Sequence, residues 1–505
     1  MFAVYELLDL LPNGFVPSFT PRLNDLCTFL MTHDQMSEKD AVVKYFGTTT
    51  RAKYFNNLKN DLKRHLTRYL IAYPSWIENE HKALYEECFR HYATYKIMLL
   101  SNKRKAGIDL AQNLLPNLLK CDLHSMAHIV ANDLLTHYST IDSTSTLAKK
   151  YEDLATRELG IVYAESIVRK YNARVFLIAN KRESFTPAMI EEFKEAVRIT
   201  EPFLNLGVHF INRLIYTIII ARYRAVYDYK NIITYCDDAL ASFPKDHPND
   251  RVLRFVFMYN KIPALTALGR LDEAKQMAKD ANKLVTTGHF NWHVVLLKRI
   301  GVCLHGGDYQ EAYELYKAHS KQPCDSYPIL NEYWKIIHGY LYFLVKQEYI
   351  EPYTDERFYL GKFLNEVPIY SKDKAGNNIN ILIIQIITRM QREQYGHIID
   401  RVDSLREYAR VYTKNPETKR ANIFISMILK MESAHFHRIR TETKTEKLFE
   451  RLQNTPLKIG QNLTVEIIPY DILWKEMLSM LANKFRGKTV KRTLRHSQSS
   501  KKNKP

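Results

Sequence analysis

Glycine and proline are scarce in this chain of 505 residues, which contains only 16 glycines and 18 prolines. Sandwiches and barrels of β-strands show turn residues roughly every 8–12 positions. Long stretches of this chain, such as Trp76–Ser101, contain neither glycine nor proline. The scarcity therefore argues against a tightly turned β architecture and favours long helices.

Membrane-spanning runs and export signals are also missing. The most apolar runs, which are Leu214–Ala221, Ile336–Val345 and Ile379–Ile387, are shorter than the roughly 20 residues that cross a bilayer. The first residues, MFAVYELLDLLPNGFVP, contain two acids and lack the basic start of a signal peptide. We therefore expect a cytoplasmic protein without a membrane partner.

The six cysteines form no CxxC pair and lie far apart, at positions 27, 88, 121, 236, 303 and 324. In a chain without an export signal, such cysteines are expected to be reduced and buried. Cys121, His124 and His128 would share one face of a helix and could begin a zinc site. No fourth ligand is evident, and a stripe of this kind is commonly core, so we predict no metal site.

Motifs that define common enzyme classes are absent. The chain contains no GxxxxGK[ST] loop, no HExxH, no GxSxG and no EF-hand loop. The loop SKDKAGNN lacks the glycine spacing with which backbone amides surround a phosphate. We predict no catalytic residues, no cofactor and no enzymatic activity.

Positive charge is in excess but unevenly spread. The net charge is +18, from 73 Lys and Arg against 55 Asp and Glu, and nine of the cations follow position 483 without a single acid. Such a Ser/Lys/Asn-rich end cannot bury a core, so residues 483–505 are predicted to form a basic, disordered tail. It could simply keep the protein soluble or attract nucleic acid.

The clearest internal order lies between residues 200 and 320. Three segments share a pattern, and they read AVYDYKNIITYCDDALASFP (225–244), ALGRLDEAKQMAKDANKLV (267–285) and HGGDYQEAYELYKA (305–318). After a turn comes an anchor, which is Tyr229, Leu271 or Tyr309, and the positions 3, 7 and 10 residues later stripe one helix face. The pattern predicts pairs of antiparallel helices that pack closely through small side chains.

This pattern resembles the tetratricopeptide repeat (TPR), and GRLDEAKQMAKDA is the best match. The anchors lie 42 and 38 residues apart, against roughly 34 in the ideal repeat, so the repeats are degenerate. Pro263 falls inside a first helix, which it is expected to kink or break. The alternative is an unrelated helical bundle with small residues at chance positions.

Three further stretches, YSKDKAGNNINILIIQIITRM, DRVDSLREYARVYTKN and VEIIPYDILWKEML, resemble an uncharacterised family of long bacterial helical proteins. This resemblance implies a helical fold and supplies no mechanism. We predict an all-α, TPR-like α-solenoid of antiparallel hairpins with an N-terminal helical cap. Its expected parts are a cap that could be helix-turn-helix-like, helical hairpins, TPR-like repeats, C-terminal hairpins and the tail, over residues 1–75, 76–204, 205–320, 321–482 and 483–505.

The cap is expected to contain helices near residues 20–32, 37–46 and 50–72, the second capped by Ser37 and Asp40. The third has an apolar stripe and a basic face, on which Lys59, Lys63, Arg64 and Arg68 are candidates for contacting nucleic acid. Against this, residues 1–75 total only about +2, and a basic face is also what a solvated cap would show.

The leading hypothesis is a protein-interaction scaffold, in which the first helices of the hairpins line a groove for a partner peptide or protein. The candidates that face the groove are Arg224, Tyr259, Asn260, Thr266 and His305. One alternative is a nucleic-acid-binding regulator with a basic N-terminal module and a TPR-like sensor body. Another is a metal-dependent enzyme that uses Cys121, His124 and His128.

Overall fold

All regular secondary structure in the described part of the chain is helical, as the sequence predicts. The computed structural model describes residues 2–12, 15–33, 36–72, 80–141, 146–180, 185–243, 250–319, 327–353, 357–366, 377–412, 416–459 and 466–483. The predicted basic tail lies outside these ranges apart from its first residue. Within them, no helix combines the length and the apolar character that crossing a bilayer requires.

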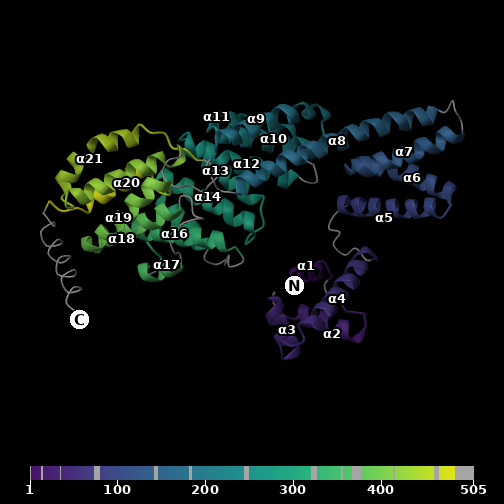
Figure 1. The fold of residues 1–505 in the computed structure, drawn as a ribbon, viewed down its shortest axis with the longest axis horizontal. Coiled ribbons are helices and arrows are strands. Elements are labelled where there is room, and N and C mark those ends of the chain that lie inside the picture. Colours follow the sequence, from purple (N-terminus) through teal and green to yellow (C-terminus); the bar gives the residue numbers. More distant parts are fainter. Residues whose placement is uncertain are drawn as a thin grey trace. The chain divides into compact units, whose positions relative to one another are not determined.

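The chain divides into two compact units, Met1–Tyr163 and Ala164–Pro505, and the division falls inside the long helix α8 (Thr146–Asn180). It therefore lies within residues 76–204, which the sequence analysis treats as one set of hairpins. The described helices of the first unit that precede α8 (Figure 1) are α1 (Phe2–Leu8), α2 (Pro21–Met31), α3 (Glu38–Phe46), α4 (Ala52–Ala72), α5 (Glu80–Leu100), α6 (Arg104–Lys120) and α7 (His124–Ile141).

The N-terminal cap contains the three predicted helices as α2, α3 and α4, preceded by α1, which the sequence analysis did not anticipate. Ser37 caps α3 as predicted, because its hydroxyl oxygen accepts from the amide of Asp40 at 3.2 Å and its hydroxyl donates to the Asp40 carboxylate at 2.6 Å. Of the apolar stripe of α4, Phe55, Leu62 and Leu66 are fully buried, whereas Tyr54 is exposed, and α4 packs against α1 and α2. These four helices therefore form a core of their own.

The second unit continues from α8 with the remaining helices. They are α9 (Pro187–Thr200), η1 (Glu201–Leu206), α10 (His209–Ala225), α11 (Tyr229–Ser242), α12 (Asp250–Ala267), α13 (Leu271–Lys283), α14 (Phe290–Gly306), α15 (Tyr309–His319), α16 (Pro328–Lys346), α17 (Leu360–Glu366), α18 (Asn377–Gln391), α19 (Tyr395–Tyr412), η2 (Pro416–Thr418), α20 (Lys419–Ser433), α21 (Arg438–Gln453) and α22 (Tyr470–Ser479). Successive helices pack as neighbours, and α18, α19, α20 and α21 lie side by side in Figure 1.

One turn geometry recurs along the second unit. At positions 228, 270, 308, 349, 394 and 436, a backbone amide donates to the carbonyl five residues earlier, and the preceding residue has a positive φ. This is the Schellman end of a helix, after which the chain reverses. The turns are 38–45 residues apart and follow α10, α12, α14, α16, α18 and α20. We call these six the first helices.

The predicted small-residue stripe is buried between the helices. In α13, Ala274, Ala278 and Ala281 are fully inaccessible to solvent. The corresponding residues of α11, which are Ile232, Cys236 and Ala239, are also buried. Side chains of this kind let the paired helices approach closely, so the periodicity seen in the sequence does reflect helix packing.

Pro263 does not break α12, although the sequence analysis expected it to kink or break a helix there. The α-helix runs without interruption from Asp250 to Ala267. The neighbours Ile262, Ala264 and Leu265 are buried in the same apolar cluster as residues of α11 and α13. Tertiary packing therefore offsets the lost backbone hydrogen bond.

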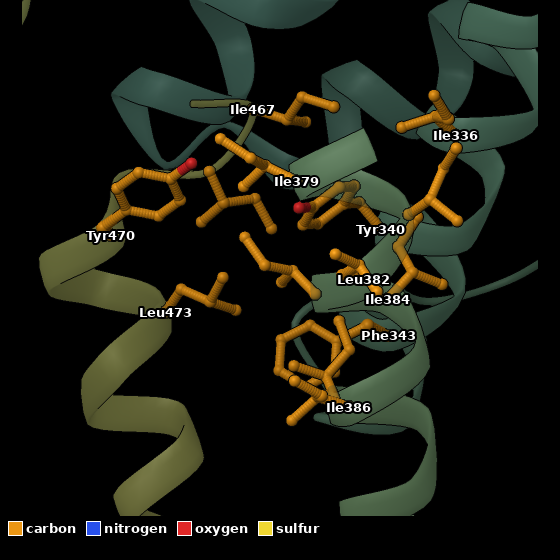
Figure 2. Packing of buried hydrophobic residues seen from close by; sticks show 14 of the residues in the cluster. Ile336, Tyr340, Phe343, Ile379, Leu382, Ile384, Ile386, Ile467, Tyr470 and Leu473 are labelled. Carbon is orange, nitrogen blue, oxygen red and sulfur yellow. The ribbon is translucent and has the colours of Figure 1, made fainter. Parts of the chain in front are cut away.

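The largest apolar cluster joins parts of the second unit that are distant in sequence. Figure 2 shows Tyr340 and Phe343 of α16, Ile379 and Ile384 of α18 and Tyr470 of α22 packed together. All five are almost fully buried. The last helix thus returns to cover the first helices α16 and α18.

The segment between α21 and α22 also returns to earlier hairpins. The Tyr229 hydroxyl lies 2.6 Å from the amide nitrogen of Ile459, from which it accepts a hydrogen bond. Further along the same segment, the carbonyl oxygen of Glu466 lies 2.7 Å from Nε2 of His305. Repeat arrays usually contact only neighbouring repeats. Here residues of a C-terminal segment instead contact Tyr229 at the start of α11 and His305 in the last turn of α14.

Candidate partner-binding site on the first helices

Arg224 at the end of α10 and Asn260 on α12 form a polar link between two first helices. One Nη of Arg224 donates a short hydrogen bond to Oδ1 of Asn260. Nδ2 of Asn260 donates to the backbone carbonyl of Val256 at 2.7 Å. The Asn260 amide therefore has a fixed orientation, and it holds the half-buried guanidinium of Arg224 beside α12.

Tyr259 and Lys298 extend this link to α14. Nζ of Lys298 lies 4.5 Å from the centre of the Tyr259 ring, within the range of a cation–π contact. The Tyr259 ring also stacks on Phe255, with 5.8 Å between ring centres. Burial raises the pKa of the Tyr259 hydroxyl to about 12, so Tyr259 presents a neutral hydroxyl and an aromatic face.

Lys298 is half-buried, and its ammonium makes neither a hydrogen bond nor an ion pair with any residue that the structure describes. Burial, and to a lesser extent the nearby charge of Arg224, lowers the pKa of Lys298 to about 7. The arrangement therefore combines two cations, an amide and an aromatic ring across three first helices. Its charge is complementary to an acidic group, and its aromatic ring to an apolar one.

The remaining two groove candidates lie in other surroundings. Thr266 is buried, and its hydroxyl donates to the carbonyl of Ile262 in its own helix. The His305 ring contacts the carbonyl of Glu466. The structure thus brings Arg224, Tyr259 and Asn260 together, whereas a segment of the same chain contacts His305.

Sequence reasoning missed Lys298, although a signal was present. It is one of few polar residues in the run HVVLLKRIGVCL, in which most of the other side chains are buried. Its neighbour Arg299 binds Glu311 at 2.8 Å, as a cation on a packed helix usually does. Neither cation has an acid one helical turn away in the sequence, so the run marks both positions, and the structure is needed to show that Arg299 pairs with Glu311 of α15 while Lys298 contacts Tyr259.

Helix α4 carries the four cations that are candidates for contacting nucleic acid. Nζ of Lys59 forms an ion pair with Glu38 at 2.5 Å. Lys63, Arg64 and Arg68 are exposed, and Arg64 lies 3.3 Å from the carboxylate of Asp61. Two of the four cations thus face acids of the same unit, which weakens the positive face that phosphate contacts require.

We expect a chain that ends at Leu481, and so lacks the basic tail, to show no salt-dependent binding of duplex DNA at low ionic strength. The measurement is fluorescence anisotropy with labelled DNA over a range of salt concentrations. Binding that weakens steeply with salt, and whose slope falls by about one unit for each of Lys63→Glu and Arg68→Glu, would instead favour the nucleic-acid hypothesis.

The two histidines that the sequence analysis weighed as zinc ligands instead form hydrogen bonds between α7 and α8 in the first unit. Nδ1 of His124 lies 2.7 Å from Oε2 of Glu158, and Nδ1 of His128 lies 2.9 Å from the carbonyl of Ala155. Cys121 is a buried free thiol whose pKa is raised by burial. Among the described residues, no three His, Cys, Asp or Glu side chains come together as a metal site would require.

Comparison with protein-family models, with curated proteins and with solved structures finds no match to this chain. The site is therefore interpreted from its own residues.

Proposed function

We propose that this protein is a non-enzymatic interaction scaffold, a TPR-like α-solenoid that binds a peptide or helix of a partner protein along its first helices. The recurring Schellman turns and the buried stripes of α11 and α13 support the solenoid. Because the turns are 38–45 residues apart, the hairpins are longer than ideal TPR units.

The observation that best supports binding is the row of Arg224, Asn260, Tyr259 and Lys298. Core positions of packed helices are usually apolar. This row instead places polar and aromatic groups, half-buried, on three successive first helices. Partly exposed aromatic rings next to cations are typical of residues that dominate the binding free energy at protein interfaces.

Selection of peptides on the purified protein tests this proposal. We expect the full chain to enrich peptides from a random library, and one of them to bind the Tyr259→Ala variant at least about tenfold more weakly than the unchanged protein. Fluorescence anisotropy with the labelled peptide gives both affinities. Circular dichroism establishes that the variant is folded.

Leu268→Ala provides the matched control. Leu268 is an exposed apolar residue of the turn that ends α12, nine positions after Tyr259 and therefore on the opposite side. Its replacement should leave the peptide affinity unchanged. If the library yields no peptide, or if both variants bind every selected peptide normally, the first helices are not the binding surface.

A further inference from the structure

Three cations near the candidate site are matched by acids. Lys261 of α12 binds Asp237 at 2.5 Å, and Arg299 of α14 binds Glu311 at 2.8 Å. Lys275 of α13 also lies within 3.4 Å of Glu311. The ammonium of Lys298 instead contacts the Tyr259 ring.

The unmatched charge at Lys298 has an energetic cost. An ammonium that is half-buried loses part of its hydration, and a second cation nearby increases the penalty. A guanidinium stays charged at physiological pH, and that of Arg224 is held close to α12 by its hydrogen bond to Asn260. Both the low pKa of Lys298 and this geometry indicate a site that favours an anion.

We infer that Lys298 and Arg224 together receive an acidic side chain, Asp or Glu, from a peptide of the partner protein. The inference rests on the proposed function and names the chemistry by which the groove selects its partner. A carboxylate at this position accepts from the Lys298 ammonium, while Arg224, held by Asn260, adds a second positive charge. The rings of Tyr259 and Phe255 then suit an apolar neighbour of that acid.

The same library selection, performed on the full chain, tests the inference. We expect the enriched peptides to share an acidic position. Replacing that acid by its amide, Glu→Gln or Asp→Asn, should weaken binding to the unchanged protein by roughly ten- to hundredfold. The Lys298→Met variant should bind the acidic peptide as weakly as the unchanged protein binds the amide peptide. The two changes combined should add little, because each removes the same interaction.

Two matched variants separate charge from packing. Lys298→Arg keeps the charge and should retain most of the affinity for the acidic peptide. Lys230→Met removes an exposed lysine of α11, which is not one of the first helices, and should leave the affinity for the acidic peptide unchanged.

The outcomes distinguish the inference from the proposed function. Peptides that lose affinity for Tyr259→Ala but show no acidic position, or that bind Lys298→Met normally, overturn the inference and leave the scaffold in place. A library that yields no peptide dependent on Tyr259 removes the scaffold proposal and the inference with it. An acidic peptide that binds Lys298→Met and Lys230→Met equally well would show attraction to the general positive charge, and it also overturns the inference.

Discussion

Replacing Arg420 by methionine is expected to lower the free energy of unfolding of the second unit by about 3–5 kcal/mol. The guanidinium donates to both carboxylate oxygens of Glu466, at 2.8 and 2.9 Å, and to the backbone carbonyls of Leu452 and Thr455. Glu466 is almost fully buried. Without Arg420, the amide of Tyr470 would be the remaining donor to this buried carboxylate among the described residues. Loss of a buried partner costs more than the pair itself contributes.

Urea denaturation, followed by circular dichroism, measures this effect. Arg451→Met is the control, since Arg451 is exposed on α21 and its removal should change the free energy of unfolding by less than about 1 kcal/mol. Arg420→Lys should fall between the two, because an ammonium cannot donate to both carboxylate oxygens in the same plane. Equal unfolding midpoints for Arg420→Met and Arg451→Met would show that the segment around Glu466 does not depend on this ion pair.

The helical class and the hairpins of the middle region could be predicted because their signals are local. Gly269 and Gly307 occupy left-handed turn positions, and the alanines of α13 form a stripe on one helix face. The later turns gave no such signal. Glu348, Glu393 and His435 adopt the same left-handed conformation without being glycine. The turn geometry therefore continues through the C-terminal half, where the sequence pattern cannot be recognised.

The candidate site was less accessible to sequence reasoning because it depends on contacts between distant residues. Arg224 and Asn260 are 36 positions apart, and the contact between them depends on how two hairpins pack. The contact that covers part of His305 comes from Glu466, 161 positions later. No local pattern indicates that a C-terminal segment returns to the third hairpin. Helical periodicity can identify a face, but it does not show what covers that face.

A second large effect is expected from a buried histidine on α15. The His319 ring stacks on the Trp334 indole, with 3.6 Å between ring centres and an angle of 8° between the rings. His293, from α14, lies 5.2 Å away edge-on. Within the described part of the chain, Nδ1 of His319 has no hydrogen-bond partner. Burial, and to a lesser extent the neighbouring His293, lowers the pKa of His319 to about 4.

This lowered pKa predicts that the second unit loses stability in mild acid. The unfolded chain binds a proton at this histidine near its ordinary pKa of about 6.5, whereas the folded protein does so only near 4. Below pH 6.5 the unfolded state is therefore favoured increasingly until pH 4 is reached. Between pH 7.5 and pH 4.5 the loss from His319 alone should be about 2.5 kcal/mol.

His319→Phe isolates this contribution, because a phenyl ring keeps the stack on Trp334 and cannot take up a proton. Urea unfolding of the variant at both pH values should show a decrease smaller than that of the unchanged protein by about 2.5 kcal/mol, since the carboxylates and His293 still titrate in both proteins. The control is His397→Phe, at an exposed histidine of α19, which should leave the pH dependence as it is. An equal decrease in the His319→Phe variant and the unchanged protein would mean that His319 is protonated in the fold as readily as in the unfolded chain. The stack on Trp334 would then be compatible with a charged imidazole ring.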